Sequence, residues 1–458
     1  MNYGTAGFRS NSDNIINISF KIGVILSYMC HKYDTNYGIM ITASHNIYTD
    51  NGVKIVNGKG NMISKDEEND LVKYVINNGI ITYDKTNKNY KIYIGYDTRY
   101  SSKTIFNKIT DGINSCDNNI DIINLGLVST PEHHFKINND NYIYYIVNLL
   151  NKTDNNIKIN IDCANGIAKY TFQNIFNLID NKNWINTTNF INFNTKKYEL
   201  LNNNCGTDYF INNKDNELNL EDGIYGSVDG DADRSIFFKI KDNKMDKLYD
   251  GDTLSYIYLY YIINYCNIRE EDICIVYTSY SNGGFINHIK NIFPNVILKC
   301  SKTGVKNCDK VARSYGKVGI YFENNGHGTV LKNENIDLKL VNYINPIVGD
   351  AVINILLILS LLNAMNKDFE YFEFNKYNLS NYKISNVCNK DDYINDDNET
   401  ELIEPLFIVN KINEIKEKYN LNRIFIRKSG TENILRVLIE GDENHIECFN
   451  ELKKYIII

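Results

Sequence analysis

Three aspartates alternate with small residues in the stretch DGDADR, where Gly230 and Ala232 separate Asp229, Asp231 and Asp233. In an extended backbone a period of two points all three carboxylates to one side, and the small residues let the chain approach an ion closely. Hard carboxylate oxygens select Mg²⁺ over Zn²⁺. A solvated acidic turn or part of a calcium loop would be the alternative, but an EF-hand is disfavoured because no glutamate stands at its twelfth position. The pattern favours a magnesium site.

A serine at position 44 lies in the stretch TASHN, directly after a short apolar run. A serine hydroxyl is a poor nucleophile, but a phosphorylated serine is a phosphoryl donor, and its charge of about −1.5 to −2 would also ligate a metal ion. His45 and Lys54 stand near enough in the sequence to position that phosphate or to move protons. Taken alone, Ser44 is better explained as a helix-capping serine. A hydrolase triad is disfavoured because the chain has no G-x-S-x-G elbow.

A candidate phosphate-binding loop lies near the C-terminus in the stretch RKSGTEN. A Ser-Gly-Thr turn directs backbone N–H groups and two hydroxyls at an anion, and flanking arginines add bidentate positive charge. The candidate ligands of the phosphate are Arg427, Ser429, Gly430, Thr431 and Arg436. An ordinary turn between two strands with two surface arginines would have the same sequence, so the motif by itself leaves both interpretations open.

Two further loops carry polar groups that suit a sugar. The stretch ENNGHGT offers Glu323, Asn325 and His327 around two glycines, which together supply donors and acceptors for sugar hydroxyls. Considered alone, this loop is better explained by a histidine that hydrogen-bonds a backbone carbonyl. The stretch KTGVK, at residues 302–306, is a weaker signal still.

The elements that must position these loops are short apolar runs, rich in β-branched residues, that end in polar, glycine-bearing segments. Such runs occur at residues 38–41, 91–94, 157–161, 273–277 and 318–322, and they lead into TASHN, GYDTR, DCANG, TSYSNGG and ENNGHGT respectively. A helical pattern at 167–179, with its apolar residues on one face, follows DCANG. Alternation of this kind predicts an α/β fold, in which ligands gather at the carboxyl ends of strands.

Length and composition predict a multidomain globular protein. The 458 residues exceed what one hydrophobic core usually supports, and the 43% hydrophobic and 23% charged residues are ordinary for a folded chain. The net charge of −7 argues against nucleic acid or an anionic membrane as the main partner. Ten cysteines without a C-x-x-C pair indicate reduced thiols and neither a zinc cage nor a disulfide framework.

The N-terminus has no secretory pattern, and the longest apolar stretch, at 351–365, is too short to cross a bilayer, so we expect a soluble, cytoplasmic protein. Changes in composition and pattern predict four domains. These are 1–140 with the serine loop, 141–246 with the aspartate loop, 247–367 with the sugar-binding loop and 368–458, a smaller α+β segment with the phosphate-binding loop.

Taken in order, the stretches GTAGFR, TASHN with DNGVK, DGDADR, KTGVK, FENNGHGT and RKSGTEN closely resemble the signature loops of the α-D-phosphohexomutase superfamily. Six loops in that order do not arise by chance, and the resemblance spans nearly the whole chain. The early GTAGFR, the CGTD at 205–208, KTGVK and NGHGT look most like its phosphoacetylglucosamine mutase branch. The resemblance implies four domains around a central cleft, of which three are related mixed α/β domains and the last is a smaller C-terminal α+β domain.

The resemblance also implies a role for each matching residue. The phosphoserine would be Ser44, which would ligate the metal ion together with Asp229, Asp231 and Asp233. Proton transfer and the charge of the transferring group would be handled by Arg9, His45, Lys54 and His327. The sugar would be bound by Arg234, Thr303, Gly304, Glu323 and Asn325. The non-transferring phosphate would be bound by Arg427, Ser429, Gly430, Thr431 and Arg436.

The implied enzyme is an intramolecular phosphotransferase that interconverts N-acetylglucosamine 6-phosphate and N-acetylglucosamine 1-phosphate. It would use phosphorylated Ser44, one Mg²⁺ ion and a hexosamine 1,6-bisphosphate intermediate, and it would supply UDP-N-acetylglucosamine synthesis. A mutase for glucose, mannose or glucosamine phosphates and a non-catalytic phosphosugar-binding protein are the alternatives. We expect a monomer whose partner is a small phosphosugar, with no nucleic acid and no membrane.

Three positions depart from the family pattern. Ile47 stands where proline usually follows TASHN, Lys428 replaces the proline of R-P-S-G-T, and Asn324 stands where alanine is common. The two lost prolines should loosen their loops without removing a reacting group. The chain is also short for this branch, so we expect trimmed peripheral loops with an effect on substrate selectivity.

Overall fold

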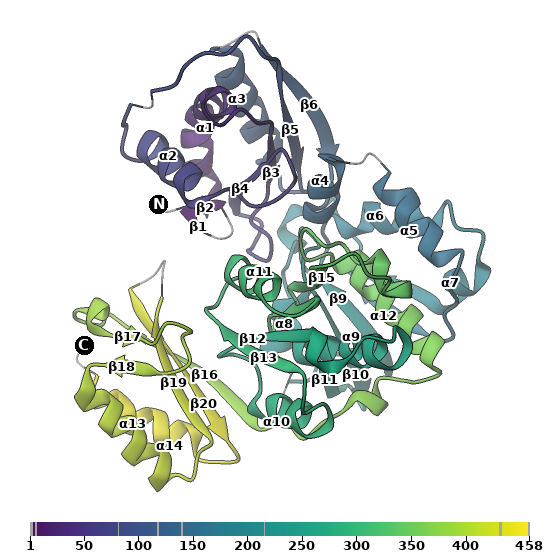
Figure 1. Cartoon of the computed structure of the whole chain (residues 1–458), viewed down its shortest axis with the longest axis vertical. Coiled ribbons are helices and arrows are strands. Elements are labelled where there is room, and N and C mark those ends of the chain that lie inside the picture. Colours follow the sequence, from purple (N-terminus) through teal and green to yellow (C-terminus); the bar gives the residue numbers. More distant parts are fainter. Residues whose placement is uncertain are drawn as a thin grey trace. The chain divides into compact units, whose positions relative to one another are not determined.

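The computed structural model describes residues 3–4, 7–80, 82–116, 119–138, 141–214, 216–429 and 433–456. The chain divides into two compact units. The first unit comprises Met1–Leu254, Asn325–Thr329 and Leu338–Asp368, and the second comprises Ser255–Asn324, Val330–Asp337 and Phe369–Ile458. Figure 1 labels most of the helices and strands along the chain.

A six-stranded mixed sheet of the order β1-β2-β4-β3-β5-β6 begins the first unit. Its strands are β1 (Tyr3–Gly4), β2 (Gly7–Asn11), β3 (Tyr37–Ile41), β4 (Asp50–Asn57), β5 (Tyr90–Tyr96) and β6 (Ile120–Leu127). Strands β3, β5 and β6 are parallel, so their carboxyl ends share one edge of the sheet. The helices of this region are α1 (Ser12–Tyr33), α2 (Lys65–Val75), α3 (Ser102–Asn114), α4 (Thr130–Lys136) and α5 (Tyr142–Leu150).

Helices α1 and α3 pack together at glycines. A Cβ added to Gly23 of α1 would lie 2.1 Å from the carbonyl oxygen of Ile109, and one added to Gly112 of α3 would lie 2.1 Å from that of Phe20. Only glycine therefore permits this backbone approach. The core beneath the helices is mostly aliphatic, with Ile25, Ile39 and Ile94 among its buried members.

A five-stranded sheet of the order β11-β10-β9-β7-β8 completes the first unit. Its strands are β7 (Ile159–Asp162), β8 (Thr188–Ile191), β9 (Gly223–Val228), β10 (Ser235–Lys241) and β11 (Lys244–Tyr249). The helices that follow its strands in sequence are α6 (Ala168–Phe176), α7 (Lys182–Thr187) and α8 (Thr207–Asn212), with the 3-10 turn η1 (Tyr198–Leu200). Helix α12 (Ala351–Met365) and the 3-10 turn η3 (Lys339–Tyr343) come much later in the chain but belong to the same unit, and α12 contacts β9 and β10. Strands β9 and β10 are antiparallel, and the aspartate loop is the connection between them.

A four-stranded sheet of the order β13-β12-β14-β15 follows, in which β12 pairs in parallel with β13 and β14. Its strands are β12 (Ile273–Thr278), β13 (Ile297–Ser301), β14 (Val318–Phe322) and β15 (Gly328–Lys332). The associated helices are α9 (Gly251–Tyr265), α10 (Gly283–Ile292) and α11 (Val305–Ser314), with the 3-10 turn η2 (Glu270–Asp272).

The C-terminal part of the second unit has an antiparallel three-stranded sheet of the order β16-β20-β19 and a small β17-β18 pair. The strands are β16 (Asn378–Ser385), β17 (Ile394–Asn395), β18 (Leu402–Glu404), β19 (Arg423–Lys428) and β20 (Ile434–Gly441). The helices are α13 (Leu406–Lys418) and α14 (His445–Lys453), with 3-10 turns η4 (Glu370–Phe372) and η5 (Lys390–Asp392).

The mixed α/β class is confirmed. The five apolar runs form β3, β5, β7, β12 and β14, and the helical pattern after DCANG forms α6. The apolar stretch at 351–365 is α12, which is buried on almost every side. Among the described helices, none combines the length and hydropathy that a membrane span needs. The four predicted domain boundaries remain predictions.

Candidate active site

Ser44 lies in a tight turn after β3, and its backbone is left-handed, with φ 50°. No helix begins at this residue, so the helix-capping explanation is wrong. Left-handed backbone at a residue other than glycine persists only where surrounding contacts impose it. The hydroxyl of Thr42 accepts the backbone N–H of Ser44 at 2.9 Å, and the serine is 1% exposed.

Contacts from outside the turn hold it in place. The guanidinium of Arg99, at the carboxyl end of β5, donates to the carbonyl oxygens of Ser44 at 2.9 Å, Asn46 at 2.8 Å and Ile47 at 2.6 Å. The amide of Asn202 also donates to the carbonyls of Ser44 and Asn46, at 2.8 and 2.9 Å. These hydrogen bonds restrain the segment in which Ile47 replaces the family proline.

The three aspartates converge through a turn and not through an extended backbone, so that part of the sequence argument was wrong. The N–H of Ala232 bonds the carbonyl of Asp229 at 3.0 Å, and Ala232 has a left-handed φ of 61°. The backbone N–H groups of Asp233 and Arg234 donate to Asp229 Oδ1 at 3.1 and 3.2 Å. As a result, one oxygen from each of Asp229, Asp231 and Asp233 lies within 4.8 Å of the other two, and all three side chains are buried.

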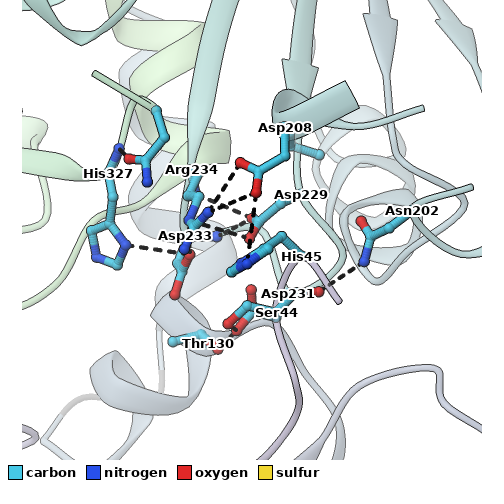
Figure 2. Close-up of polar contacts among 12 residues, drawn as sticks. Ser44, His45, Thr130, Asn202, Asp208, Asp229, Asp231, Asp233, Arg234 and His327 are labelled. Atoms are coloured by element: carbon cyan, nitrogen blue, oxygen red, sulfur yellow. Dashed lines mark hydrogen bonds and ion pairs between the residues drawn. The ribbon is translucent and has the colours of Figure 1, made fainter. Parts of the chain in front are cut away.

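Ser44 and the aspartate turn meet at one carboxylate oxygen. Asp231 Oδ2 accepts hydrogen bonds from Ser44 Oγ at 3.0 Å, from Thr130 Oγ1 at 2.6 Å and from Lys54 Nζ at 2.8 Å. Figure 2 shows Ser44, Thr130 and Asp231 gathered beside Asp233. Ser44 and Thr130 follow β3 and β6, so the shared edge of the parallel strands explains why they meet.

Two cations complete this cluster. Lys54 Nζ also bonds Asp233 Oδ2 at 2.8 Å, so a single ammonium bridges two aspartates. The guanidinium of Arg9 donates to Ser44 Oγ at 3.2 Å and to Asn46 Oδ1 at 3.2 Å. Both cations come from neighbouring strands, since Arg9 on β2 pairs with Gly52 on β4.

The aspartates keep oxygens that suit a divalent cation. Asp229 Oδ2, Asp231 Oδ1 and Asp233 Oδ1 are buried, yet they accept no hydrogen bond from any residue that the structure describes. Buried acceptors without a hydrogen bond are costly unless something else satisfies them, and Arg234 Nε, at 3.8 Å from Asp229 Oδ2 and Asp233 Oδ1, offers only a distant charge. Three carboxylate oxygens at this spacing are the donor set that Mg²⁺ prefers, so the residues present fit that ion.

Burial and neighbouring charges set the protonation of the carboxylates in opposite directions. Burial, reinforced by the other two aspartates, raises the pKa of Asp229 well above its usual range. Burial also raises the pKa of Asp231, but Lys54, the hydroxyl of Thr130 and Arg9 together outweigh it, so the net pKa is low. The pKa of Asp233 is likewise lowered overall, since the nearby cations outweigh burial and the charge of Asp231.

The bases around the cluster are shifted as well. Burial lowers the pKa of Lys54, but Asp231 and Asp233 raise it further, so the ammonium is retained. Burial, followed by the charges of Arg234 and Arg9, lowers the pKa of His45 to about 2. His45 is therefore neutral at pH 7 in this arrangement.

Arg234 and His327 flank the aspartate turn in the first unit. Arg234 Nη1 bonds Asp208 Oδ1 at 3.1 Å, and His45 Nε2 lies 3.6 Å from Asp208 Oδ2. His327 Nδ1 lies 3.4 Å from Asp233 Oδ1. Figure 2 shows Asp208 above His45 and Arg234, with His327 on the far side of Asp233.

Asn325 lies beside His327, since its Oδ1 accepts the backbone N–H of His327 at 3.1 Å. Within the first unit the structure thus brings together ten predicted site residues. These are Arg9, Ser44, His45, Lys54, Asp229, Asp231, Asp233, Arg234, Asn325 and His327.

The remaining predicted residues lie in the second unit, in two groups. In the first group the backbone N–H of Gly304 donates to Glu323 Oε1 at 2.9 Å, so the KTGVK and ENNGHGT loops are joined. The neighbouring Thr303 is bonded through both its N–H and its hydroxyl to Glu399 Oε2, at 3.2 and 3.0 Å.

The second group is the C-terminal loop. Arg427 on β19 pairs with Arg436 on β20 in register, which places the two arginines side by side. Arg427 Nε donates to the hydroxyl of Tyr280 at 2.9 Å, and the N–H of Ser429 donates to the carbonyl of Ile434 at 3.0 Å. The predicted phosphate ligands Gly430 and Thr431 lie outside the described residues.

Sequence reasoning missed several residues that build this site. Arg99 stands in the GYDTR loop and Asp208 in CGTD, so a search for polar residues in loops after strands could have found them. Thr130 and Asn202 carry no motif of their own, and only their contacts with Asp231 and with the serine turn reveal them.

Three family models match parts of the chain. "Phosphoglucomutase/phosphomannomutase, alpha/beta/alpha domain I" matches residues 5–79 and 74–185, "Phosphoacetylglucosamine mutase AMG1, domain III" matches 250–342, and "Phosphoglucomutase/phosphomannomutase, C-terminal domain" matches 394–447. Together these matches cover most of the chain and contain the serine, sugar-binding and phosphate-binding loops.

Full-length relatives match over nearly all of their length. Phosphoacetylglucosamine mutase 1 of Schizosaccharomyces pombe is 29% identical over 96% of this chain and 95% of its own. The solved substrate complex of an N-acetylglucosamine-phosphate mutase, described as a member of the α-D-phosphohexomutase superfamily, has 28% identity and a TM-score of 0.85 over 99% of this chain and 95% of that one. An Aspergillus fumigatus N-acetylphosphoglucosamine mutase, solved with GlcNAc-6P and magnesium, has a TM-score of 0.85 and 22% identity over 99% of this chain and 94% of that one.

The fold, the order of the site loops and these similarities agree along the whole chain. The chain belongs to the α-D-phosphohexomutase superfamily, in its phosphoacetylglucosamine mutase branch.

Proposed function

We propose that this protein is a phosphoacetylglucosamine mutase, an intramolecular phosphotransferase that interconverts N-acetylglucosamine 6-phosphate and N-acetylglucosamine 1-phosphate. The observation that carries the proposal is the hydrogen bond of 3.0 Å between Ser44 Oγ and Asp231 of the aspartate cluster. A phosphoryl group on this hydroxyl would lie beside three carboxylates that fit Mg²⁺ and beside Arg9. The names of the full-length relatives support the N-acetylglucosamine substrate.

Mg²⁺ would be held by Asp229, Asp231 and Asp233, where it would neutralise charge on the transferring group. Ser44 Oγ carries the phosphoryl group in the resting enzyme. Its bond to phosphorus breaks as a free sugar hydroxyl attacks in line, and the product is a hexosamine 1,6-bisphosphate. Return of the other phosphoryl group to Ser44 Oγ releases the isomeric monophosphate.

The cations around Ser44 have distinct tasks. Arg9 contacts Ser44 Oγ and spreads the negative charge that develops in the transfer. Lys54 retains its proton and shares Asp231 Oδ2 with Ser44, so it lies where a proton can reach the serine oxygen as its bond breaks. His327 lies beside the aspartate turn and is the candidate acceptor of the sugar hydroxyl proton. His45, whose pKa of about 2 makes it a poor base, would instead position the phosphoryl group.

The sugar and its second phosphate would be bound by the other predicted residues. We assign the sugar to Arg234, Thr303, Gly304, Glu323 and Asn325, and the non-transferring phosphate to Arg427, Ser429, Gly430, Thr431 and Arg436. The paired arginines on β19 and β20 support the phosphate assignment, because guanidinium groups bind phosphate bidentately. We further propose a monomer in the cytoplasm, whose product feeds UDP-N-acetylglucosamine synthesis.

The test is a substrate comparison with a matched pair of serine variants. With Mg²⁺ present, kcat/KM for N-acetylglucosamine 6-phosphate should exceed that for glucose 6-phosphate; the reverse order would assign the protein to another hexose. Ser44→Ala should abolish most turnover and remove the phosphate that intact-mass analysis detects. Ser115→Ala, which changes an exposed serine at the end of α3, should leave both unchanged. Near wild-type turnover in Ser44→Ala would refute the phosphoserine.

A further inference from the structure

A tight turn between β17 and β18 presents one glutamate in an unusual backbone conformation. Glu399 has a left-handed φ of 54°. The carboxylate of Asp396 imposes this conformation because it accepts the backbone N–H of Thr400 at 2.5 Å and of Glu401 at 2.9 Å, together with the hydroxyl of Thr400 at 2.8 Å. A left-handed glutamate is strained, and strain that is held in place in this way is often found at functional positions.

Glu399 is bonded to the loops that follow β12 and β13. Its Oε2 accepts the N–H of Thr303 at 3.2 Å and the hydroxyl of Thr303 at 3.0 Å. Its own carbonyl oxygen accepts a hydrogen bond from the hydroxyl of Ser279. Both Glu399 and the loops belong to the second unit.

The loop that Glu399 holds has no cap of its own. Helix α11 begins at Val305, and no side chain of its N-cap residue, Gly304, can accept a hydrogen bond from the first turn. The amides just before the helix are instead satisfied by two carboxylates, that of Glu399 on Thr303 and that of Glu323 on Gly304. Anions are stabilised at a helix N-terminus, so both contacts are favourable. Glu399 and Glu323 together define the conformation of Thr303 and Gly304.

We propose that Glu399 is a positioning residue for sugar binding, which acts by holding Thr303 in the orientation that the substrate requires. This rests on the proposed function, in which Thr303, Gly304 and Glu323 contact the sugar. Glu399 acts through Thr303 and not on the transferring phosphoryl group. Its loss therefore weakens ground-state and transition-state binding alike, which raises KM and leaves kcat nearly unchanged.

The test compares three variants of the full-length enzyme with N-acetylglucosamine 6-phosphate. Glu399→Ala removes both bonds to Thr303 and should raise KM about tenfold while kcat changes less than about twofold. Glu399→Gln keeps an oxygen that can accept both bonds but loses the charge, so KM should rise only about threefold. Glu401→Ala, an exposed glutamate two residues away, is the control and should have wild-type constants.

A second measurement does not depend on activity. Amide hydrogen exchange at Thr303 and Gly304 should be faster in Glu399→Ala than in the wild type, and unchanged in Glu401→Ala. Unchanged exchange would overturn the inference that Glu399 holds this loop. Faster exchange with an unchanged KM would overturn the link to sugar binding. A wild-type protein inactive on every hexose phosphate would instead refute the proposed function, and exchange would still report whether Glu399 holds Thr303.

Discussion

Replacing Lys54 by methionine should separate the electrostatics of the aspartate cluster from its packing. The ammonium of Lys54 lies 2.8 Å from both Asp231 Oδ2 and Asp233 Oδ2, and both carboxylates are almost fully buried. Methionine has a similar volume and a flexible chain, so it should fill the space without a large cavity. What the substitution removes is the positive charge that these two aspartates share.

The size of the effect follows from these distances. At an effective dielectric constant of about 20, each contact of 2.8 Å represents roughly 6 kcal/mol of attraction, much of which offsets the cost of burying the charges. Removing one partner of a buried ion pair typically costs about 3 to 5 kcal/mol. Without Mg²⁺, Lys54→Met should therefore lower the midpoint of thermal unfolding by about 3 to 5 °C, because the unfolding entropy of a chain of 458 residues is about 1 kcal/mol/K.

Mg²⁺ should reverse much of this loss. The variant keeps the three carboxylates and lacks the cation that neutralises two of them, so it should bind Mg²⁺ more tightly than the wild type. A saturating concentration of about 100 times Kd would add about 2.7 kcal/mol of stability. The variant should nevertheless lose most of its mutase activity, because Lys54 is the proposed proton donor to Ser44.

Thermal unfolding and calorimetric titration, each with EDTA and with Mg²⁺, measure these effects. Lys59→Met, an exposed lysine just after β4, is the matched control and should behave as the wild type. Wild-type stability of Lys54→Met in EDTA would show that the ammonium does not stabilise the cluster. Weaker Mg²⁺ binding in the variant would show that Lys54 supports the metal ion and does not compete with it.

Two further predictions concern groups outside this cluster. Burial raises the pKa of Asp350 to about 7 despite hydrogen bonds from Ile353 and Tyr142, so between about pH 4 and 7 the folded chain holds a proton that the unfolded chain releases. The free energy of unfolding should therefore fall as pH rises through that window. Asp350→Asn keeps the helix cap but cannot titrate, so the midpoint of urea unfolding should depend less on pH in this variant. The same pH dependence in the variant and the wild type would show that Asp350 is not the cause. Arg427→Ala should raise KM for the phosphosugar about tenfold to a hundredfold, because a charged hydrogen-bond donor to phosphate is lost. An unaltered KM in steady-state assays would place the phosphate site elsewhere.

Much of the site could be predicted from the sequence because its reacting groups lie in short contiguous loops. The run at 318–322 is strand β14 with the same bounds, and the apolar run before TASHN is β3. Strand and loop patterns are local, since side-chain alternation and turn residues act over a few positions. The carboxylates of DGDADR and the serine of TASHN are likewise readable because each motif carries its own chemistry.

The local geometry of those motifs was harder to predict. The aspartates converge because Ala232 adopts a left-handed turn, not because the backbone is extended. Ser44 is held in a strained conformation by Arg99 and Asn202, and neither residue lies in its loop. A backbone conformation that is imposed from outside leaves no signal in the segment that adopts it.

The sequence by itself determined which chemical groups are present, the α/β class and the order of the loops along the chain. Only the tertiary structure decided which of those groups meet: Ser44 and Asp231 are 187 residues apart, and Thr130 joins the same carboxylate from 101 residues away. It also decided that Thr303 is held by Glu399, 96 residues further on. The physical reason is that such contacts depend on how parallel strands align their ends and how loops pack, which no local pattern of residues encodes.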